Sequence, residues 1–239
     1  MRKGFTLTEV LITLGIIGIV AALTIPSIIE NYKKKETEAK LKKGYSAIAQ
    51  YVQKAEADNG SFCSWAMEGS DKIFELYVLP YFDVIDSSLK KNYSTGSFLD
   101  NIGYNRNLII NGGYTSFKTL EGKPYDDFWS DYYFLTKDGM LFGIGVHQNK
   151  SWYNCPWQVF VDLNGPKKPN VAGKDLFLFE IIGSIKNTKV NGMSIGCSCS
   201  GTECKWNYKT TYEDCIKYGH YCSNIIIQNG WKIPKDYPW

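Results

Sequence analysis

The hydrophobic and polar positions predict one long helix at the start of the chain. Residues 10–29 are almost purely apolar and carry no charge. About 20 helical residues at ~1.5 Å each span the ~30 Å core of a bilayer. Apolar residues then recur at three- and four-residue steps, as on one face of a helix: Leu41, Tyr45, Ile48, Val52 and Ala55. We therefore expect a helix from about Thr6 to Ala57, weakened at Gly44 by ~1 kcal/mol relative to Ala and ended by Asp58-Asn59-Gly60.

β-Strand patterns appear beyond residue 130. Tyr132–Thr136 and Met140–Val146 flank Lys137-Asp138-Gly139, which predicts a hairpin on an Asp-Gly turn. Trp157–Leu163 and Leu176–Ile182 predict two further strands. Together with the helical stripe, these segments predict an α+β fold in which an antiparallel sheet of at least four strands packs against the helix.

Other segments carry weaker signals. Ile73–Phe82 predicts a short helix ending at Pro80, and residues 87–123 predict loops. Thr210-x-x-Glu213 fits a capping box, which favours one helix from Thr211 to about Gln228. We expect the closing aromatic residues to pack back on the head.

Charge is concentrated just after the apolar run. The net charge of +3 is too small to indicate a specific nucleic-acid partner. Lysines nevertheless outnumber carboxylates directly after the apolar residues. The lysines are Lys33, Lys34, Lys35, Lys40, Lys42 and Lys43, and the carboxylates are Glu30, Glu36 and Glu38. If the amino terminus stays in the cytoplasm, these lysines must be translocated, against the positive-inside rule. We expect them to lie along a soluble helix.

The first nine residues combine a short basic leader with a carboxylate at the edge of the apolar segment. Arg2 and Lys3 precede Gly4, Phe5 follows, and Glu9 comes just before the apolar run. A carboxylate there is unfavourable unless it is paired, which indicates assembly as well as anchoring. A secretory signal peptide has a shorter apolar core and a small-residue cleavage site. A plain signal anchor explains neither Gly4-Phe5 nor Glu9.

This segment, Lys3–Leu11, resembles the cleavage and methylation motif of type IV prepilins and type II secretion pseudopilins. The resemblance implies that a prepilin peptidase cuts between Gly4 and Phe5 and methylates the new amine. It implies that Glu9 pairs with this amine on a neighbouring subunit. It also places Pro26 where many pilins have a helix-bending proline, whereas Thr8 replaces the commoner aliphatic residue.

The resemblance implies a pilin-like organisation and location. The expected parts are a leader peptide (1–4), a transmembrane and filament-core half of the helix (5–29), an amphipathic half (30–60), and a globular β-rich head with a cysteine-rich end (61–239). The precursor would be a single-pass inner-membrane protein with its head outside the cytoplasm, and the filament would lie in the periplasm or on the cell surface. Its partners would be copies of itself or related pilins, the peptidase, the assembly platform, and membrane lipid before assembly.

The seven cysteines suit disulfides in an exported domain. They are Cys63, Cys155, Cys197, Cys199, Cys204, Cys215 and Cys222. On a single helix, Cys215 and Cys222 would lie ~10 Å apart, too far to bond each other. We expect them to bond to two of the three preceding cysteines, which leaves Cys63 and Cys155 as a pair and one odd thiol. A zinc cluster of Cys197, Cys199 and Cys204 is the alternative, although the usual two-residue spacing is absent.

The head offers weak signals for a metal or for catalysis. Asp162-Leu163-Asn164-Gly165 opens like a calcium loop, and Asn170 and Asp175 follow. The EF-hand pattern fails because Gly173 stands at the twelfth position, where Glu is needed. Some pseudopilins hold calcium in a loop of the head, but Asx turns explain these residues equally well. Calcium is the one cofactor that the sequence suggests.

Catalysis is not expected. Gly192-x-Ser194-x-Gly196 matches the serine-hydrolase elbow, but that elbow needs a preceding strand and a following helix, and a polar run and a cysteine loop stand there. His147 and His220 have no metal partner at a recognisable spacing.

The sequence therefore predicts a structural subunit, a pilin or pseudopilin, and no enzyme. One alternative is a minor pilin or tip adhesin that binds DNA, glycan or another surface through the many Tyr and Trp residues of the head. A membrane-tethered enzyme is less favoured, because the sequence has no polar catalytic cluster. The stem does not distinguish a type IV pilus from a DNA-uptake pilus or a type II secretion filament.

Overall fold

The structure, a computed structural model of the whole chain, consists of two compact units, Met1–Thr37 and Glu38–Trp239. It describes residues 4, 6–60, 65, 70–88, 95–104, 108–110, 113–125, 132–146, 156–184, 187–192 and 208–239. One helix, α1, contributes to both units, and the second unit is the head. The domain bounds derived from the resemblance stay predictions.

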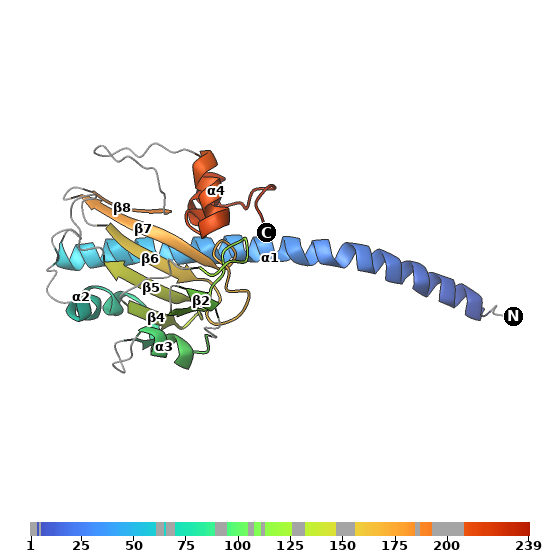
Figure 1. Cartoon of the computed structure of the whole chain (residues 1–239), viewed down its shortest axis with the longest axis horizontal. Helices are drawn as coiled ribbons and strands as arrows, with labels where there is room; N and C mark the ends of the chain where they lie inside the picture. Colours follow the sequence, from blue (N-terminus) through green and yellow to red (C-terminus); the bar gives the residue numbers. More distant parts are fainter. Residues whose placement is uncertain are drawn as a thin grey trace. The chain divides into compact units, whose positions relative to one another are not determined.

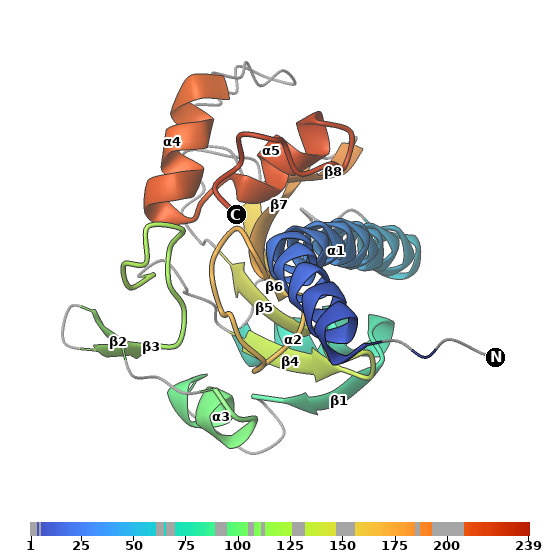
Figure 2. The same cartoon turned by 90° about the vertical axis from the view of Figure 1, so that its right-hand side faces the viewer.

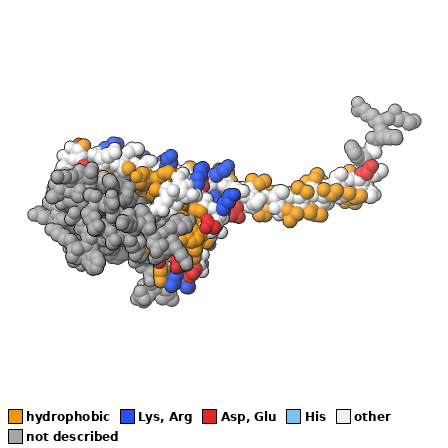
Figure 3. Space-filling view, turned by 90° about the horizontal axis from the view of Figure 1, so that it is seen from above, with side chains coloured by type: hydrophobic (Ala, Val, Ile, Leu, Met, Phe, Trp, Pro, Cys, Tyr) orange, Lys and Arg blue, Asp and Glu red, His pale blue; other side chains and the backbone are white. Residues whose placement is uncertain are grey.

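The predicted long helix is confirmed. α1 (Leu7–Asn59) continues without interruption through Pro26. In the first unit its large apolar side chains are exposed, and the helix is long and apolar enough to cross a membrane (Figure 3). In the head, its buried residues recur at three- and four-residue steps: Leu41, Gly44, Ile48, Tyr51, Val52 and Ala55. The apolar stripe therefore faces the core of the head.

The head is built on a six-stranded antiparallel sheet with the order β1-β4-β5-β6-β7-β8 (Figure 1). Its strands are β1 (Val84–Ser87), β4 (Tyr132–Thr136), β5 (Leu141–Val146), β6 (Pro156–Asp162), β7 (Leu176–Ser184) and β8 (Asn187–Gly192). In the predicted hairpin, Phe134 pairs with Phe142 and Gly139 adopts a φ of 82° in the turn. The predicted α+β fold and its four strands are confirmed, and β1 and β8 extend the sheet at its edges.

Both faces of the sheet are buried (Figure 2). Along β7, Phe177 and Phe179 join the cluster that contains the α1 stripe, whereas Leu176 and Leu178 join a second cluster on the other face. This second cluster includes Phe98 and other residues that connect the sheet to the elements before β4. Burial on both faces explains why β7 has an almost continuous apolar sequence instead of an alternating one.

Several shorter elements come between α1 and β4 in the sequence. They are α2 (Ser70–Tyr77), the 3-10 helix η2 (Leu79–Tyr81), α3 (Thr95–Asn101), and the paired strands β2 (Leu108–Ile110) and β3 (Gly113–Thr115). α2 and η2 match the helical segment predicted before residue 82. The segment predicted as loops instead contains α3 and the small β2–β3 hairpin.

Gly44 has a packing role that its sequence position does not reveal. A Cβ atom at Gly44 would lie 3.1 Å from Cγ1 of Val161 on β6. The missing side chain therefore allows α1 to lie close against the sheet. Tight packing offsets the loss of helix propensity expected for this glycine.

The prediction of one carboxy-terminal helix is wrong. The chain forms two helices, α4 (Tyr208–Tyr218) and α5 (Cys222–Gln228), because it turns back at Gly219, where φ is 74°. A Cβ atom at Gly219 would lie 2.4 Å from the Cβ atom of Ala172, so only glycine fits this turn. α4 also begins two residues before Thr210, which means that the predicted capping box does not start this helix.

The closing segment packs back on the head as predicted. The ring of Trp231 lies 5.0 Å from that of Tyr45 on α1. Tyr237 is buried, and its hydroxyl donates a hydrogen bond to the carbonyl oxygen of Gly173 at 2.6 Å. The end of the chain thus joins α1 to the loop between β6 and β7.

Candidate functional site

Reciprocal hydrogen bonds between Thr6 and Glu9 close the first turn of α1. The backbone N–H and the hydroxyl of Thr6 each donate to Oε2 of Glu9 at 2.8 Å, and the N–H of Glu9 donates to Oγ1 of Thr6 at 3.3 Å. This arrangement is a capping box with Thr6 as the cap. A negative charge near the amino end of a helix also interacts favourably with the helix dipole. The capping box therefore holds the Glu9 carboxylate at the start of the apolar helix.

Glu9 is one of the predicted site residues, whereas Thr6 is not. The sequence does carry the signal for Thr6, because Thr-x-x-Glu stands before an apolar run here as well as at Thr210 and Glu213. The box uses only atoms from Thr6 onward, so a cut between Gly4 and Phe5 leaves its hydrogen bonds intact.

The other predicted site residues of the stem do not gather into one cluster. Gly4 is exposed, and a Cβ atom built there has no neighbour within 4 Å among the described residues. Phe5 lies outside the described residues. Pro26 lies inside α1. Processing at Gly4-Phe5 and roles for Glu9 and Pro26 in assembly stay predictions.

The apolar half of α1 satisfies its hydroxyl groups locally. Thr13, Thr24 and Ser27 donate to the carbonyl oxygens of Val10, Val20 and Thr24, each at 2.9 Å. Such bonds let hydroxyl side chains lie in an apolar environment. The segment therefore offers apolar surface for lipid or for a like helix, with Glu9 as the carboxylate at its edge.

The structure contradicts the predicted pairing of the carboxy-terminal cysteines. Cys215 and Cys222 form a disulfide with each other, and their Cα atoms are 4.8 Å apart. The expected ~10 Å separation assumed one continuous helix, whereas the turn at Gly219 brings the ends of α4 and α5 together. The other cysteines lie outside the described residues, so their pairing and the zinc alternative stay predictions; they are Cys63, Cys155, Cys197, Cys199 and Cys204.

The predicted calcium residues lie close together between β6 and β7; they are Asp162, Asn164, Asn170 and Asp175. Asp175 accepts hydrogen bonds from the backbone N–H groups of residues 170 and 171 at 2.7 and 2.6 Å. It also accepts one from Nδ2 of Asn164 at 3.3 Å. Asp162 accepts hydrogen bonds from the N–H of Asn164 at 3.1 Å and from the hydroxyl of Tyr104 at 2.8 Å. Protein donors therefore bind both carboxylates, in the manner of Asx turns.

Burial raises the pKa of both carboxyl groups. Desolvation and the nearby charge of Asp175 raise the pKa of Asp162 well above its usual range. Desolvation raises the pKa of Asp175 to about 6, although the backbone hydrogen bonds oppose this shift. Among the described residues, no group of three His, Cys, Asp or Glu side chains is placed to hold a metal ion. The hydrogen bonds explain this loop without an ion, and calcium binding stays a prediction.

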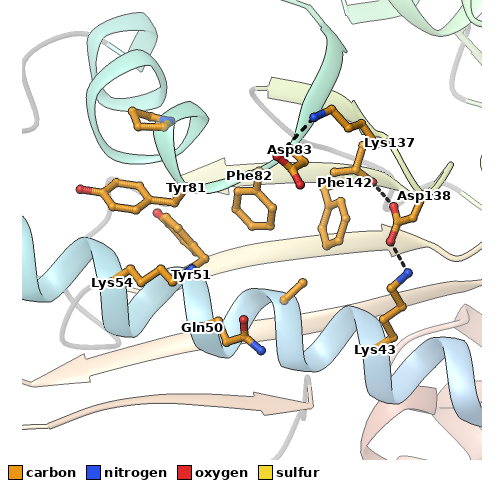
Figure 4. A pocket seen from close by; sticks show the side chains of 13 residues that line it. Lys43, Gln50, Tyr51, Lys54, Tyr81, Phe82, Asp83, Lys137, Asp138 and Phe142 are labelled. Atoms are coloured by element: carbon orange, nitrogen blue, oxygen red, sulfur yellow. Dashed lines mark hydrogen bonds and ion pairs between the residues drawn. The ribbon is translucent and has the colours of Figure 1, made fainter.

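A groove of about 550 Å³ lies along one side of α1 in the head (Figure 4). Its opposite wall is formed by residues 80–83 and the β4–β5 turn. Nζ of Lys43 pairs with Oδ2 of Asp138 at 2.9 Å across one end, and the hydroxyl of Tyr81 donates to Oδ2 of Asp58 at 3.1 Å near the other. Tyr51 lines the groove, and its buried hydroxyl has no hydrogen-bond partner in the described part of the chain.

The described lining of this groove gives no sign of a nucleophile or of a histidine base. Its described lining combines aromatic rings, lysines and aspartates but includes no Ser, Cys or His. Ser194, Gly196 and His147 lie outside the described residues. His220 is only partly exposed, and its ring lies 5.4 Å from that of Tyr221.

Two sequence profiles match the chain. A profile described as "Prokaryotic N-terminal methylation motif" matches residues 1–25. A profile described as "Family of unknown function (DUF6613)" matches residues 27–105 and 114–239. No curated protein and no solved structure matches the chain. The first profile covers the leader and much of the apolar segment, and the second covers the rest of α1 and the head.

Proposed function

Because the chain belongs to the DUF6613 family and begins with a prokaryotic N-terminal methylation motif, we propose that it is a structural subunit of a type IV pilus or type II secretion filament. The observation that carries this proposal is the match of the motif to an apolar helix that continues into an α+β head. The chain would be made as a single-pass inner-membrane precursor and would polymerise through α1.

Processing would occur at the start of the exposed amino-terminal segment. A prepilin peptidase would cut between Gly4 and Phe5 on the cytoplasmic side and methylate the new amine. Among the described residues, no atom lies within 4 Å of a Cβ atom added at Gly4, which suits a peptidase that must approach the backbone. The head would remain outside the cytoplasm.

Assembly would use the apolar surface of α1 and the carboxylate of Glu9. Neighbouring stems would bury the side chains that are exposed in the single chain, which favours association by ~25 cal/mol per Å² of apolar surface removed from water. The Glu9 carboxylate would pair with the Phe5 amine of a neighbour, because two opposite charges are less unfavourable in an apolar core than either alone. The pairing would also set the register between subunits.

A second candidate role is that of a minor pilin or tip adhesin. The groove beside α1 favours it, because aromatic rings, lysine side chains and a buried Tyr51 hydroxyl, which has no hydrogen-bond partner among the described residues, line a space large enough for part of a ligand. Both roles share the same stem and the same processing.

Mass spectrometry of the mature amino terminus tests the proposal. The chain, produced in its host membrane with a prepilin peptidase, should begin at N-methylated Phe5. Gly4→Leu should leave the leader attached, whereas Lys3→Gln, a matched change one residue earlier, should still be cut at the same bond. A wild-type chain that begins at Met1, or that is cut after Ala22, would contradict the proposed processing.

A further inference from the structure

We infer that the end of the head at which α1 crosses from the first unit binds the anionic phospholipid headgroups of the membrane that holds the unassembled subunit. The lysines that carry this inference are Lys42, Lys167, Lys168 and Lys235, here called the basic rim; all four are exposed. The inference rests on the proposed function, because it requires the chain to be anchored through the apolar half of α1.

The β6–β7 loop and the β4–β5 turn lie side by side at this end of the head. Nζ of Lys43 on α1 reaches Oδ2 of Asp138 in the turn at 2.9 Å. A Cβ atom at Gly165 would lie 2.8 Å from the carbonyl oxygen of Gly139, so the loop touches the same turn. Lys167 and Lys168 come two and three residues after Gly165 and are therefore close to the first residues of α1 in the head.

The closing segment of the chain completes the basic rim. The N–H of Ile233 donates to Oε1 of Glu38 on α1 at 2.8 Å, and the hydroxyl of Tyr237 donates to the carbonyl oxygen of Gly173 in the β6–β7 loop at 2.6 Å. Lys235 lies between these two contacts. Figure 2 shows the carboxy terminus and the loop after β6 beside α1 at this end of the head.

The carboxylates at this end are mostly neutralised or buried. Lys232 pairs with Glu38 at 3.3 Å, and Lys43 pairs with Asp138. Asp162 and Asp175 are 1% and 4% exposed. Asp236 is an exposed carboxylate beside Lys235. The exposed charge that remains on the basic rim is therefore predominantly positive.

The membrane is the partner that chain connectivity keeps within reach. Eight residues separate Ile29, at the end of the apolar segment, from Glu38, the first residue of the head unit. They span ~13 Å as a helix and at most ~30 Å fully extended, whatever angle the two units adopt. An anionic membrane surface attracts each nearby lysine by ~1 kcal/mol and acts within a Debye length of ~8 Å.

Binding to an anionic membrane would also give a role to the lysines after residue 29, whose positive charge is unfavourable for translocation. The lysines after residue 29 lie on the side that must cross the membrane, against the usual bias. Lys33 and Lys35, both exposed on α1, come between the apolar segment and Glu38 in the sequence and would add to the same attraction. Head and stem lysines together would hold the head near the bilayer until assembly.

Hydrogen exchange of the full chain in lipid nanodiscs tests the inference. Discs of phosphatidylcholine alone are compared with discs that also contain phosphatidylglycerol. We expect exchange of residues 163–175 and 229–239 to slow several-fold in the anionic discs only, and high salt to remove the difference. Lys167→Gln, Lys168→Gln and Lys235→Gln combined should abolish it. Lys54→Gln, Lys72→Gln and Lys217→Gln combined, the same charge change at exposed positions elsewhere on the head, should not.

Three results would overturn the inference. Equal exchange in both kinds of disc contradicts it, as does equal loss of protection in the two triple variants. Protection that occurs in filaments but not in anionic discs assigns the basic rim to a neighbouring subunit instead. Failure of the chain to insert into either kind of disc would contradict the proposed anchoring itself, and insertion without lipid-dependent protection contradicts this inference alone.

Discussion

At the scale of single residues, Thr6 and Glu9 form the unit that presents a carboxylate at the start of α1. A free glutamate side chain samples several rotamers, and pairing it with a neighbour's amine then costs conformational entropy. The capping box restricts the side chain before any neighbour arrives. We therefore expect Thr6 to act as a positioning residue for Glu9.

Thr6→Val should open the first turn of α1. The valine keeps the side-chain shape but removes the cap, which typically destabilises a helix terminus by ~1 kcal/mol. Amide exchange of residues 7–10, measured by NMR in detergent micelles, should accelerate, and filament yield should fall. Thr8→Val, a matched change outside the capping box, should leave both close to wild type. Equal effects of the two variants would show that the box has no role.

The surroundings of Glu180 lead to another testable prediction at the residue scale. It lies on β7 opposite Gln158 of β6 and Asn191 of β8, and burial raises its pKa to about 7. A carboxyl group whose pKa is raised by folding disfavours the folded state once it is ionised. Its destabilising effect is absent below the unfolded pKa of ~4.3, grows as the pH rises, and is complete above about pH 7.

Glu180→Gln should therefore stabilise the head at high pH. We expect the variant to gain up to about 3 kcal/mol in free energy of unfolding at pH 8, and little at pH 4, because both forms are then neutral. Denaturant unfolding followed by tryptophan fluorescence at the two pH values measures this gain. Glu213→Gln, at an exposed carboxylate on α4, is the control and should show no such gain. A gain of the same size at both pH values would contradict the assigned cause.

At the scale of secondary-structure elements, the approach of α1 to β6 depends on Gly44. The 3.1 Å distance from an added Cβ atom to Val161 leaves no room for a side chain unless the helix moves. The head half of α1 should thus be sensitive to one added side chain.

Gly44→Val should destabilise the head by ~1–3 kcal/mol through overpacking, although valine has a higher helix propensity than glycine. Urea unfolding of the full chain in detergent, followed by tryptophan fluorescence, measures the loss. Gln53→Val places the same side chain at an exposed position of α1 and serves as the control. A Gly44→Val chain as stable as wild type would show that α1 is not packed closely here.

The disulfide between α4 and α5 has a direct chemical test. Trypsin cuts after Lys217 and so separates Cys215 from Cys222. A non-reducing tryptic map should contain residues 210–217 linked to residues 218–232. Reduction should lower stability by ~2–3 kcal/mol, the value expected for a short closed loop. Either cysteine linked to Cys197, Cys199 or Cys204 instead would contradict the pairing in the structure.

Elements with a regular hydrophobic period could be predicted from the sequence, and those that depend on one contact could not. The α1 stripe has a clear helical period, and β4 to β7 are apolar runs separated by turn or polar residues, so the sequence predicts them. The split between α4 and α5 depends on Gly219 meeting Ala172, which no local pattern reveals. β8, with the polar sequence Asn187–Gly192, forms at the sheet edge by pairing with β7 and has no apolar period of its own.

The sequence predicts those site residues that belong to a local motif. It does not predict those that are brought together only by the folded chain. Gly4, Phe5 and Glu9 follow from the resemblance to prepilins, and Thr6 needed the structure although its signal was present. The groove beside α1 joins residues from three separated segments, so only the folded head brings them together.

At the scale of the whole molecule, the apolar half of α1 and two surfaces of the head have distinct proposed roles. In the proposed function, the apolar half of α1 would serve first as a membrane anchor and then as the core of a filament. The basic rim would act while the membrane still holds the subunit. The groove beside α1 would be a binding surface in the second candidate role.

Mass spectrometry of purified filaments tests whether the chain is processed and assembled as proposed. Filaments are sheared from cells, or collected from the periplasmic fraction, and the chain's amino-terminal peptide is sequenced. We expect the chain to be present in the filaments and to begin at N-methylated Phe5, and we expect Glu9→Leu to remove it from them. A chain absent from every filament fraction, or present only in the membrane with Met1 at its start, would contradict the proposed function.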